Sequence, residues 1–276
     1  MTTHPNTLRP IFYLGLSLIL CLSACSGESA PSVDDQATNI DSTEQAPDDM
    51  PETTDDSPAA ESTSTDGKVL RHAVFFSFKE EATDEQVDTI VQAFRDLPNK
   101  IEEITDFQWG INNSPEGKDD GFTHCFLLTF ANEAGRETYL PHPAHKEFGK
   151  TLGGLNDQVF VIDYWGTPGE PMEKELKHAV FFKFKDDAKP EDIKAVEEAF
   201  AALPEKIDAI KGFEWGINNS PERHDAGFTH CFMVTFGSEA DREEYLPHPD
   251  HKKFVEVLLP VLDKVRVLDF WAEGKL

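Results

Sequence analysis

The chain has 276 residues, with 25 Lys and Arg against 52 Asp and Glu, and a formal net charge of −27. This length allows one large domain or two of ordinary size, and a hydrophobic fraction of 39% excludes a wholly disordered chain. The acid excess argues against nucleic acid as a partner, because a polyanion is bound by a basic surface.

The first 25 residues are typical of a bacterial lipoprotein signal peptide. Arg9 precedes an apolar run over residues 11–22, which is too short for a membrane-spanning helix. The run ends in Leu-Ser-Ala-Cys at Cys25, a sequence that resembles a lipobox, whose cysteine is lipidated. We therefore expect membrane lipid as a partner through Cys25 and a periplasm-facing place in the cell envelope. Ser26, where an Asp would indicate inner-membrane retention, favours the outer membrane. The alternative is an ordinary cleaved signal with an incidental cysteine.

Residues 26–67 predict a disordered acidic tether. They contain twelve Asp and Glu and no Lys or Arg, and Ser, Thr, Pro and Ala make up most of the remainder. A segment without apolar periodicity buries too little surface to offset its chain entropy. The tether would separate a folded domain from the lipid surface. Capture of cations or of a partner by the acids is the alternative.

The rest of the chain contains one unit in two copies, at a constant offset of 106 residues without a gap. Four segments recur. His72-Ala-Val-Phe-Phe recurs from His178, and Trp109-Gly-Ile-Asn-Asn-Ser-Pro-Glu recurs from Trp215. Phe122-Thr-His-Cys-Phe recurs from Phe228, and Tyr139-Leu-Pro-His-Pro recurs from Tyr245. This pattern indicates tandem duplication. We place one domain at residues 68–166, a linker at 167–175 and a second domain at 176–273.

The elements of the first copy follow from its periodicity. An aromatic, β-rich segment predicts a strand over residues 72–79. Asp84 is expected to cap a helix that Pro98 ends or kinks. The apolar residues that recur at helical spacing in it are Val87, Ile90, Val91 and Phe94. Further strands are expected over residues 107–112, 122–130 and 159–165, and Pro143 should begin a helix that continues to Leu152. The residues expected to share one face of the third strand are Phe122, His124, Phe126, Leu128 and Phe130.

The element order βαββαβ predicts an α+β fold with two tandem ferredoxin-like units. Helices would cover one face of each antiparallel sheet and leave the other face to be buried. Two tandem copies can bury it against each other, so we expect an intramolecular dimeric α/β barrel, which is a monomeric pseudo-dimer.

Two of the four cysteines, Cys125 and Cys231, fall inside the folded part, each in the sequence Thr-His-Cys-Phe. There is no CxxC pair and no dense cysteine framework, so we expect two buried thiols. A disulfide between them is the alternative in an oxidising envelope.

Both copies resemble the stress-responsive dimeric α/β-barrel (Dabb) family. The motifs are His-Ala-Val-Phe-Phe-x-Phe-Lys, Asn-x-Ser-Pro-Glu, Gly-Phe-Thr-His, Tyr-Leu-Pro-His-Pro-x-His-x-x-Phe and Val-x-x-Asp-Tyr/Phe-Trp, and they span nearly all of each unit. Members are mostly homodimers, which implies an internal dimer for a chain with two copies. Many members have no known activity, and a few resemble polyketide cyclases that use a His and a Tyr in metal-free aldol chemistry.

The cyclase pattern implies catalytic roles for the second His of His-Pro-x-His and for the Tyr before it. These residues are His145 and Tyr139, and His251 and Tyr245 in the second copy. Strand histidines of the same implied ligand pocket match His72, His124, His178 and His230. A neutral imidazole can accept an acidic proton, and a phenol can stabilise the developing enolate oxygen.

Structural roles are the alternative to this chemistry. His142 precedes Pro143, and a His near a helix start can accept bonds from free backbone N–H groups. A zinc site formed by His72, His124 and His145 is a third alternative, although the spacing matches no zinc motif. We expect no metal and no cofactor, because the sequence has no nucleotide loop, Gly-x-Ser-x-Gly or HExxH.

Two functions remain open at this point. The first is a membrane-anchored Dabb protein that acts as a binding or stress-related module with an unidentified ligand, for which a small hydrophobic molecule is one candidate. The second is a cofactor-free, polyketide-cyclase-like lyase that uses the His and Tyr residues. A concave apolar pocket in which these side chains converge would favour the lyase, and a filled core would favour the other.

Overall fold

The computed structural model describes residues 67–274 of the chain. The signal peptide expected over residues 1–25, with Cys25, lies outside the described residues, and so does the expected tether apart from Gly67. Within residues 67–274, every helix is too short or too polar to cross a bilayer.

Each repeat folds into four strands and three helices. The elements of the first repeat are β1 (Val69–Phe78), α1 (Asp84–Arg95), β2 (Ile104–Ile111), β3 (His124–Phe130), α2 (Glu133–Tyr139), α3 (Pro143–Leu152) and β4 (Asn156–Gly166). Those of the second are β5 (Leu176–Phe184), α4 (Pro190–Ala201), β6 (Gly212–Ile217), β7 (His230–Phe236), α5 (Glu239–Tyr245), α6 (Pro249–Leu258) and β8 (Leu262–Trp271).

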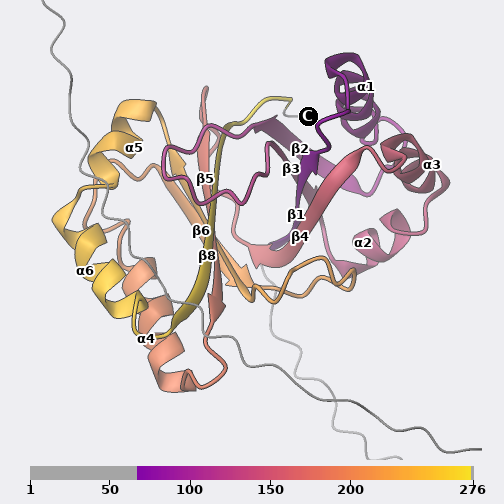
Figure 1. Ribbon diagram of the computed structural model, residues 1–276. Coiled ribbons are helices and arrows are strands. Elements are labelled where there is room, and N and C mark those ends of the chain that lie inside the picture. The colour runs from indigo at the N-terminus through magenta and orange to yellow at the C-terminus, as the bar shows by residue number, and fades with distance from the viewer. Residues whose placement is uncertain (1–66, 275–276) are drawn as a thin grey trace, which may run out of the picture. The chain divides into compact units, whose positions relative to one another are not determined.

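The two sheets have the strand orders β2-β3-β1-β4 and β6-β7-β5-β8, with antiparallel neighbours throughout. This is the ferredoxin-like order, so the predicted α+β fold of two tandem units is confirmed. Figure 1 shows the helices of each repeat on the outer side of its own sheet, with the two sheets between the helix layers.

Three apolar clusters stabilise this arrangement. One lies between sheet and helices in each repeat, where aromatic pairs such as Phe94 and Phe148 stack with ring centroids 4.6 Å apart. The third contains residues of both repeats, and in it Phe181 contacts Phe75 and Phe160 at 5.2 and 4.9 Å between centroids. Each buried Phe side chain contributes roughly 1.5–3 kcal/mol. The inner sheet faces therefore bury each other within one chain, as predicted.

The sheet edges meet closely at two seams, β2 beside β8 and β4 beside β6. At the first, Trp109 and Glu273 exchange backbone hydrogen bonds of 3.0 and 2.9 Å. A Cβ added to Gly110 would lie 2.5 Å from the Trp271 carbonyl oxygen, and one added to Gly216 would lie 2.9 Å from Cβ of Tyr164. Both glycines permit this approach because they lack a side chain.

The capping residue of α1 and the number of helices differ from the sequence prediction. Thr83, not Asp84, caps α1: its hydroxyl accepts from the Gln86 N–H, and the Gln86 side chain accepts from the Thr83 N–H. This reciprocal pair is a capping box. Helix α2 was not predicted, because it has only seven residues and buries only Arg136 and Tyr139. Each unit is therefore βαββααβ.

Phe122 is also placed differently. The strand begins at His124, so Phe122 lies in the loop before it and packs in the shared cluster, 5.9 Å from the ring of Phe160. The prediction that it shares a face with Phe126 is wrong.

Cys125 and Cys231 are free, buried thiols in the apolar cluster that the two repeats share, as expected. Burial raises the pKa of both thiols.

A glycine pair tests the seam. Gly110→Ala should lower the free energy of unfolding by about 1–3 kcal/mol, because the new methyl overlaps the β8 backbone. Gly149→Ala, in the exposed part of α3 where an added Cβ meets nothing within 4 Å, should raise it by about 0.4–1 kcal/mol. Urea unfolding measures both variants, and equal stability of the two would contradict the seam.

Candidate functional site

Each repeat contains a pocket between its sheet and its helices. The first has a volume of about 310 Å³ and the second of about 190 Å³. The polar lining of the first consists of His72, Tyr139, His145, Lys146, Glu222 and His224. That of the second consists of Glu116, Lys118, His178, Tyr245 and His251. In both cases the remaining lining is almost entirely apolar, and residues of the opposite repeat complete the pocket.

A buried His–Asp pair forms the inner end of the first pocket. His72 on β1 and Asp163 on β4 are register partners in the sheet, and the His72 Nδ1 lies 2.7 Å from the Asp163 Oδ1. The Nδ1–H therefore donates to the carboxylate, and the ring presents Nε2 to the pocket. Nε2 lies 3.8 Å from Oε2 of Glu222.

Opposite charges set the protonation of this pair. Burial alone would lower the pKa of His72, but the Asp163 carboxylate outweighs burial and raises it above the usual value. Burial would likewise raise the pKa of Asp163, yet His72 and Arg136 keep it below its usual value. The pair therefore favours imidazolium and carboxylate.

Arg136 extends the pair to the opposite repeat. From α2, its Nη1 donates to Asp163 Oδ2 at 2.9 Å and to Asn219 Oδ1 of the second repeat at 2.7 Å. The side-chain oxygen of Asn218, the residue before Asn219, accepts from the Asp163 backbone N–H at 3.1 Å. The carboxylate that orients His72 thus also connects the two repeats.

The loop after each second strand crosses to the other repeat. The Val161 N–H on β4 donates to the His224 carbonyl at 3.1 Å, and the Val267 N–H on β8 donates to the Lys118 carbonyl at 3.0 Å. These backbone bonds place Glu222 at the pocket of the first repeat and Glu116 at that of the second.

Tyr139 and His145 lie together beside His72. Their ring centroids are 4.3 Å apart, and those of Tyr139 and His72 are 5.5 Å apart. The Tyr139 side chain is fully buried, and within the described part of the chain its hydroxyl finds no hydrogen-bond partner. Burial raises the pKa of this phenol well above its usual value. It therefore remains a neutral donor.

His145 presents its second nitrogen as an acceptor. Its Nδ1–H donates to the Leu140 carbonyl at 3.0 Å, which leaves Nε2 for the pocket. Burial lowers the pKa of His145. A neutral imidazole with an available Nε2 is a suitable proton acceptor.

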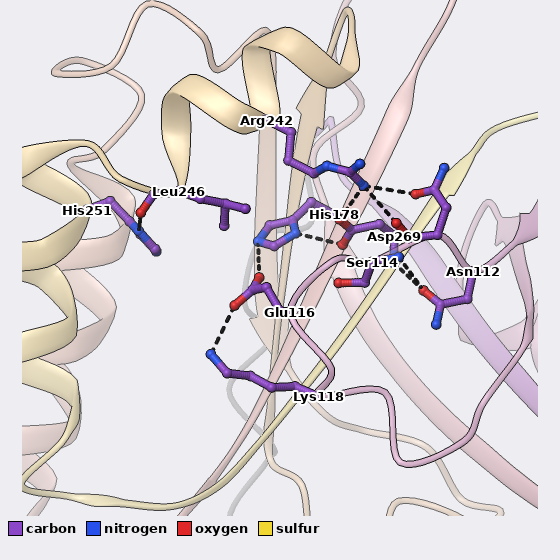
Figure 2. Close-up of polar contacts among 10 residues, drawn as sticks. Asn112, Ser114, Glu116, Lys118, His178, Arg242, Leu246, His251 and Asp269 are labelled. Carbon is purple, nitrogen blue, oxygen red and sulfur yellow. Dashed lines mark hydrogen bonds and ion pairs between the residues drawn. The ribbon is translucent and has the colours of Figure 1, made fainter. Parts of the chain in front are cut away.

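The second pocket repeats this arrangement (Figure 2). The His178 Nδ1 is 2.7 Å from the Asp269 Oδ1, and Arg242 donates to Asp269 Oδ2 at 2.8 Å and to Asn113 Oδ1 of the first repeat at 2.9 Å. The His251 Nδ1 contacts the Leu246 carbonyl at 3.0 Å. The hydroxyl of Tyr245 also has no partner among the described residues, and burial raises its pKa.

Two of the predicted pocket histidines lie elsewhere. His124 and His230 begin β3 and β7 and do not line the pockets. The Nδ1 of each forms a hydrogen bond of 2.8 Å with the hydroxyl of the preceding threonine. The Nε2 of His230 also lies 3.0 Å from a carboxylate oxygen of Glu197. Burial lowers the pKa of both. The expectation that they share a pocket with His72 and His178 is wrong in position.

A further cavity of about 420 Å³ lies beneath the linker that joins the repeats. Four of its charged lining residues form two ion pairs: Arg71 contacts Glu214 at 3.0 Å, and Lys177 contacts Glu175 at 3.0 Å. The histidines and tyrosines predicted to act in chemistry do not line it. We therefore place the candidate site in the two apolar pockets.

Over residues 67–274, no group of three or more His, Cys, Asp or Glu side chains has an arrangement that could bind a metal ion. The zinc alternative required His124, which does not line the pocket that contains His72 and His145.

Sequence reasoning missed Asp163, Arg136 and Glu222. Asp163 and Glu222 belong to motifs that recur in both repeats, Asp-Tyr/Phe-Trp and Asn-Ser-Pro-Glu. The recurrence of these acids could have marked them as site residues, but the sequence gives no role for them. Together the side chains supply an imidazolium, a neutral imidazole, a phenol donor and a carboxylate acceptor around an apolar space. Such a set can bind a carbonyl oxygen and move a proton at a neighbouring atom.

Comparison with known proteins relates this chain to one domain family. The family model of the Stress responsive A/B Barrel Domain matches residues 70–166 and 176–272. The stress-response A/B barrel domain-containing protein HS1 of Arabidopsis thaliana is 38% identical over 101 residues, covering 37% of this chain and 93% of that protein. Olivetolic acid cyclase of Cannabis sativa is 28% identical over 95 residues, covering 34% of this chain and 94% of that protein.

Among solved structures, an anthrone oxidase-like protein covers 77% of this chain and 94% of its own chain, with a TM-score of 0.60 and 10% sequence identity. At this identity the likeness concerns the fold alone. It extends over more of the chain than one repeat.

The His–Asp pairs predict a pH dependence of stability. Because the pKa values of His72 and His178 are raised by folding, their contribution is complete below the unfolded value of about 6.5 and is lost as pH rises through the folded values. We expect the free energy of unfolding to fall over this interval. His72→Gln with His178→Gln, which retains a donor for each Asp, should flatten the fall.

Urea unfolding at several pH values measures this effect. His124→Gln is the control, because the lowered pKa of His124 gives a contribution of opposite sign that is lost as pH falls. An undiminished fall in the double variant would contradict the assignment.

Proposed function

Because the chain belongs to the stress-responsive A/B barrel family, with one copy of the domain in each repeat, we propose that its pockets bind a small, largely apolar molecule with a carbonyl group and transfer a proton on it. The proposed reaction class is that of a metal-independent lyase or cyclase. The binding or stress-related module without chemistry is the other function compatible with the family.

One observation carries the proposal. The hydroxyl of Tyr139 and Oε2 of Glu222 are both buried without a hydrogen-bond partner in the described chain, beside His72 and His145, in an otherwise apolar pocket. A buried polar atom without a partner costs roughly 1–3 kcal/mol. A ligand that pairs with these atoms would remove that cost.

In the proposed reaction, His145 is the base. Its Nε2 accepts a proton from the carbon next to the ligand carbonyl, while the Tyr139 hydroxyl donates a hydrogen bond to the oxygen on which negative charge develops. To form a ring, the enolate carbon would then attack a second carbonyl carbon of the ligand, the π bond of that carbonyl would break, and Nε2 would return the proton to the alkoxide oxygen; the reverse sequence would cleave the carbon–carbon bond. With a ligand that has no second carbonyl, the proton returns to carbon. His251 and Tyr245 would act in the same way in the second pocket.

His72 has a positioning and electrostatic role in this proposal. Asp163 fixes its ring and favours its positive charge, and a positive charge near the pocket stabilises an enolate. The sequence similarity to olivetolic acid cyclase supports a cyclase or lyase class without identifying the substrate. The match covers 94% of that protein, which is therefore about as long as one repeat.

Hydrogen–deuterium exchange tests the proposed chemistry. Benzylacetone in deuterated buffer should gain deuterium next to its carbonyl faster with the protein than without it, as measured by NMR. His145→Gln together with His251→Gln should reduce the catalysed rate by roughly 10²–10⁴-fold, the usual contribution of a general base. A catalysed rate that survives in the double variant would overturn the role of these histidines.

Tyr139→Phe separates a functional hydroxyl from a structural one. Loss of an unpartnered buried hydroxyl should leave the free energy of unfolding unchanged or raise it by up to about 1 kcal/mol, while the exchange rate falls. Ser77→Ala is the matched control, because the Ser77 hydroxyl accepts from the Gln158 N–H at 3.1 Å and its loss should be destabilising. A destabilised Tyr139→Phe would contradict the functional role.

We also propose that lipid on Cys25 attaches the protein to the cell envelope, with the folded part facing the periplasm as a single chain, outer membrane favoured. The lipobox-like end of the apolar run and the acidic spacer after it support the membrane attachment. The single-chain state is supported by the inner sheet faces, which cover each other within one chain. Two acyl signals are needed for stable anchoring.

Mass spectrometry of the mature protein tests the anchor. The N-terminus should be at Cys25 and carry acyl mass, and Cys25→Ser should release the protein from membranes. A mature N-terminus at another residue, or an unmodified Cys25, would overturn it.

A further inference from the structure

The two pockets differ at residues that occupy equivalent positions in the repeats. Lys118 and His224 correspond to each other, as do Gly149 and Val255, and all four line their pockets. The catalytic-type residues are the same in both. Differences at the remaining lining positions can therefore change which ligand each pocket accepts.

The first difference concerns the glutamate from the opposite repeat. In the second pocket, Nζ of Lys118 lies 2.9 Å from Oε2 of Glu116, so that carboxylate already has a partner (Figure 2). In the first pocket, the equivalent Glu222 has His224 two residues later, and its Oε2 is buried without a hydrogen-bond partner among the described residues. The His72 Nε2, at 3.8 Å, is beyond hydrogen-bond distance of this atom, so Glu222 is available to a donor on a ligand.

The unpartnered tyrosine hydroxyls are common to both pockets. A phenol O–H donates to a ligand acceptor such as a carbonyl oxygen. Beyond the histidines that both pockets share, the first pocket thus presents one donor and one acceptor to a ligand, Tyr139 and Glu222. The second presents the donor Tyr245, while its glutamate, Glu116, is bound to Lys118.

The second difference concerns size. A Cβ at Gly149 would meet nothing within 4 Å, so the first pocket is open at this point of α3. Val255 places a branched side chain at the equivalent point of α6. The cavity volumes agree with this difference, since they are about 310 and 190 Å³.

We propose that the two pockets select different ligands. The first takes a broader molecule with both a hydroxyl donor and a carbonyl acceptor, of the class of hydroxyaryl ketones, with the hydroxyl on Glu222 and the carbonyl on Tyr139. The second takes a slimmer molecule with the acceptor alone, of the class of aliphatic ketones. This inference rests on the proposed function, because it assigns substrates to the same sites.

A matched pair of probes tests the inference on the full chain. Para-hydroxybenzylacetone and benzylacetone differ only in the hydroxyl, and methyl hexyl ketone is the slim probe. The ring NMR signals of His145 and His251 report the two pockets separately. We expect the hydroxyl to strengthen binding at the first pocket by about tenfold or more, as for a hydrogen bond to a charged group, and methyl hexyl ketone to bind the second.

Exchange of the equivalent residues provides the decisive variants. Glu222→Leu should abolish the hydroxyl preference at the first pocket, and the matched control Glu116→Leu should leave it intact. His224→Lys should reduce the preference about tenfold by pairing Glu222. Lys118→His with Val255→Gly should create it at the second pocket, by freeing Glu116 and enlarging the space.

The outcomes separate this inference from the function on which it rests. Equal binding of the two aryl ketones at the first pocket, or a preference that survives Glu222→Leu, overturns the inference and leaves the proposed function standing. Absence of any response of His145 and His251 to all three ketones overturns both. A hydroxyl preference confined to the first pocket and transferred by the exchange supports the inference.

Discussion

The buried carboxylates of Asp163 and Asp269 are the constraint on which the fold and both pockets depend. Each is fully buried, and an uncompensated buried charge costs several kcal/mol. A strand-partner histidine and an arginine from the short second helix compensate each charge. The same arginine reaches an asparagine of the opposite repeat. One set of contacts therefore orients the pocket histidine and joins the two repeats.

Duplication within one chain has a consequence that a homodimer does not share. In a symmetric dimer the same substitution appears in both sites, whereas here each pocket combines residues of its own repeat with a loop of the other. Residues 118 and 224 can therefore change independently, and so can residues 149 and 255. The repeated core, with its shared cluster of aromatic side chains, stays the same while the pockets diverge.

The sequence predicted the repeats, the four strands of each unit and the helix that begins at Pro143, because these depend on local periodicity and on recurring motifs. It also brought Tyr139 and His145 together through family resemblance. The resemblance misplaced His124, because a matching motif does not fix a position along the strand: His124 pairs with Phe76 at the strand end, four residues from His72. The sequence could not find the Glu222 contact, since that contact depends on how the repeats meet, and α2 was too short to give a pattern.

The most direct test of this account asks whether a residue of one repeat acts on the pocket of the other. Glu222→Gln, a substitution in the second repeat, should shift the ring NMR signals of His72 and His145 in the first repeat. It should leave those of His178 and His251 unchanged, because the loop that carries Glu222 lies against the first pocket. Shifts confined to His178 and His251 would contradict the shared construction of the pockets.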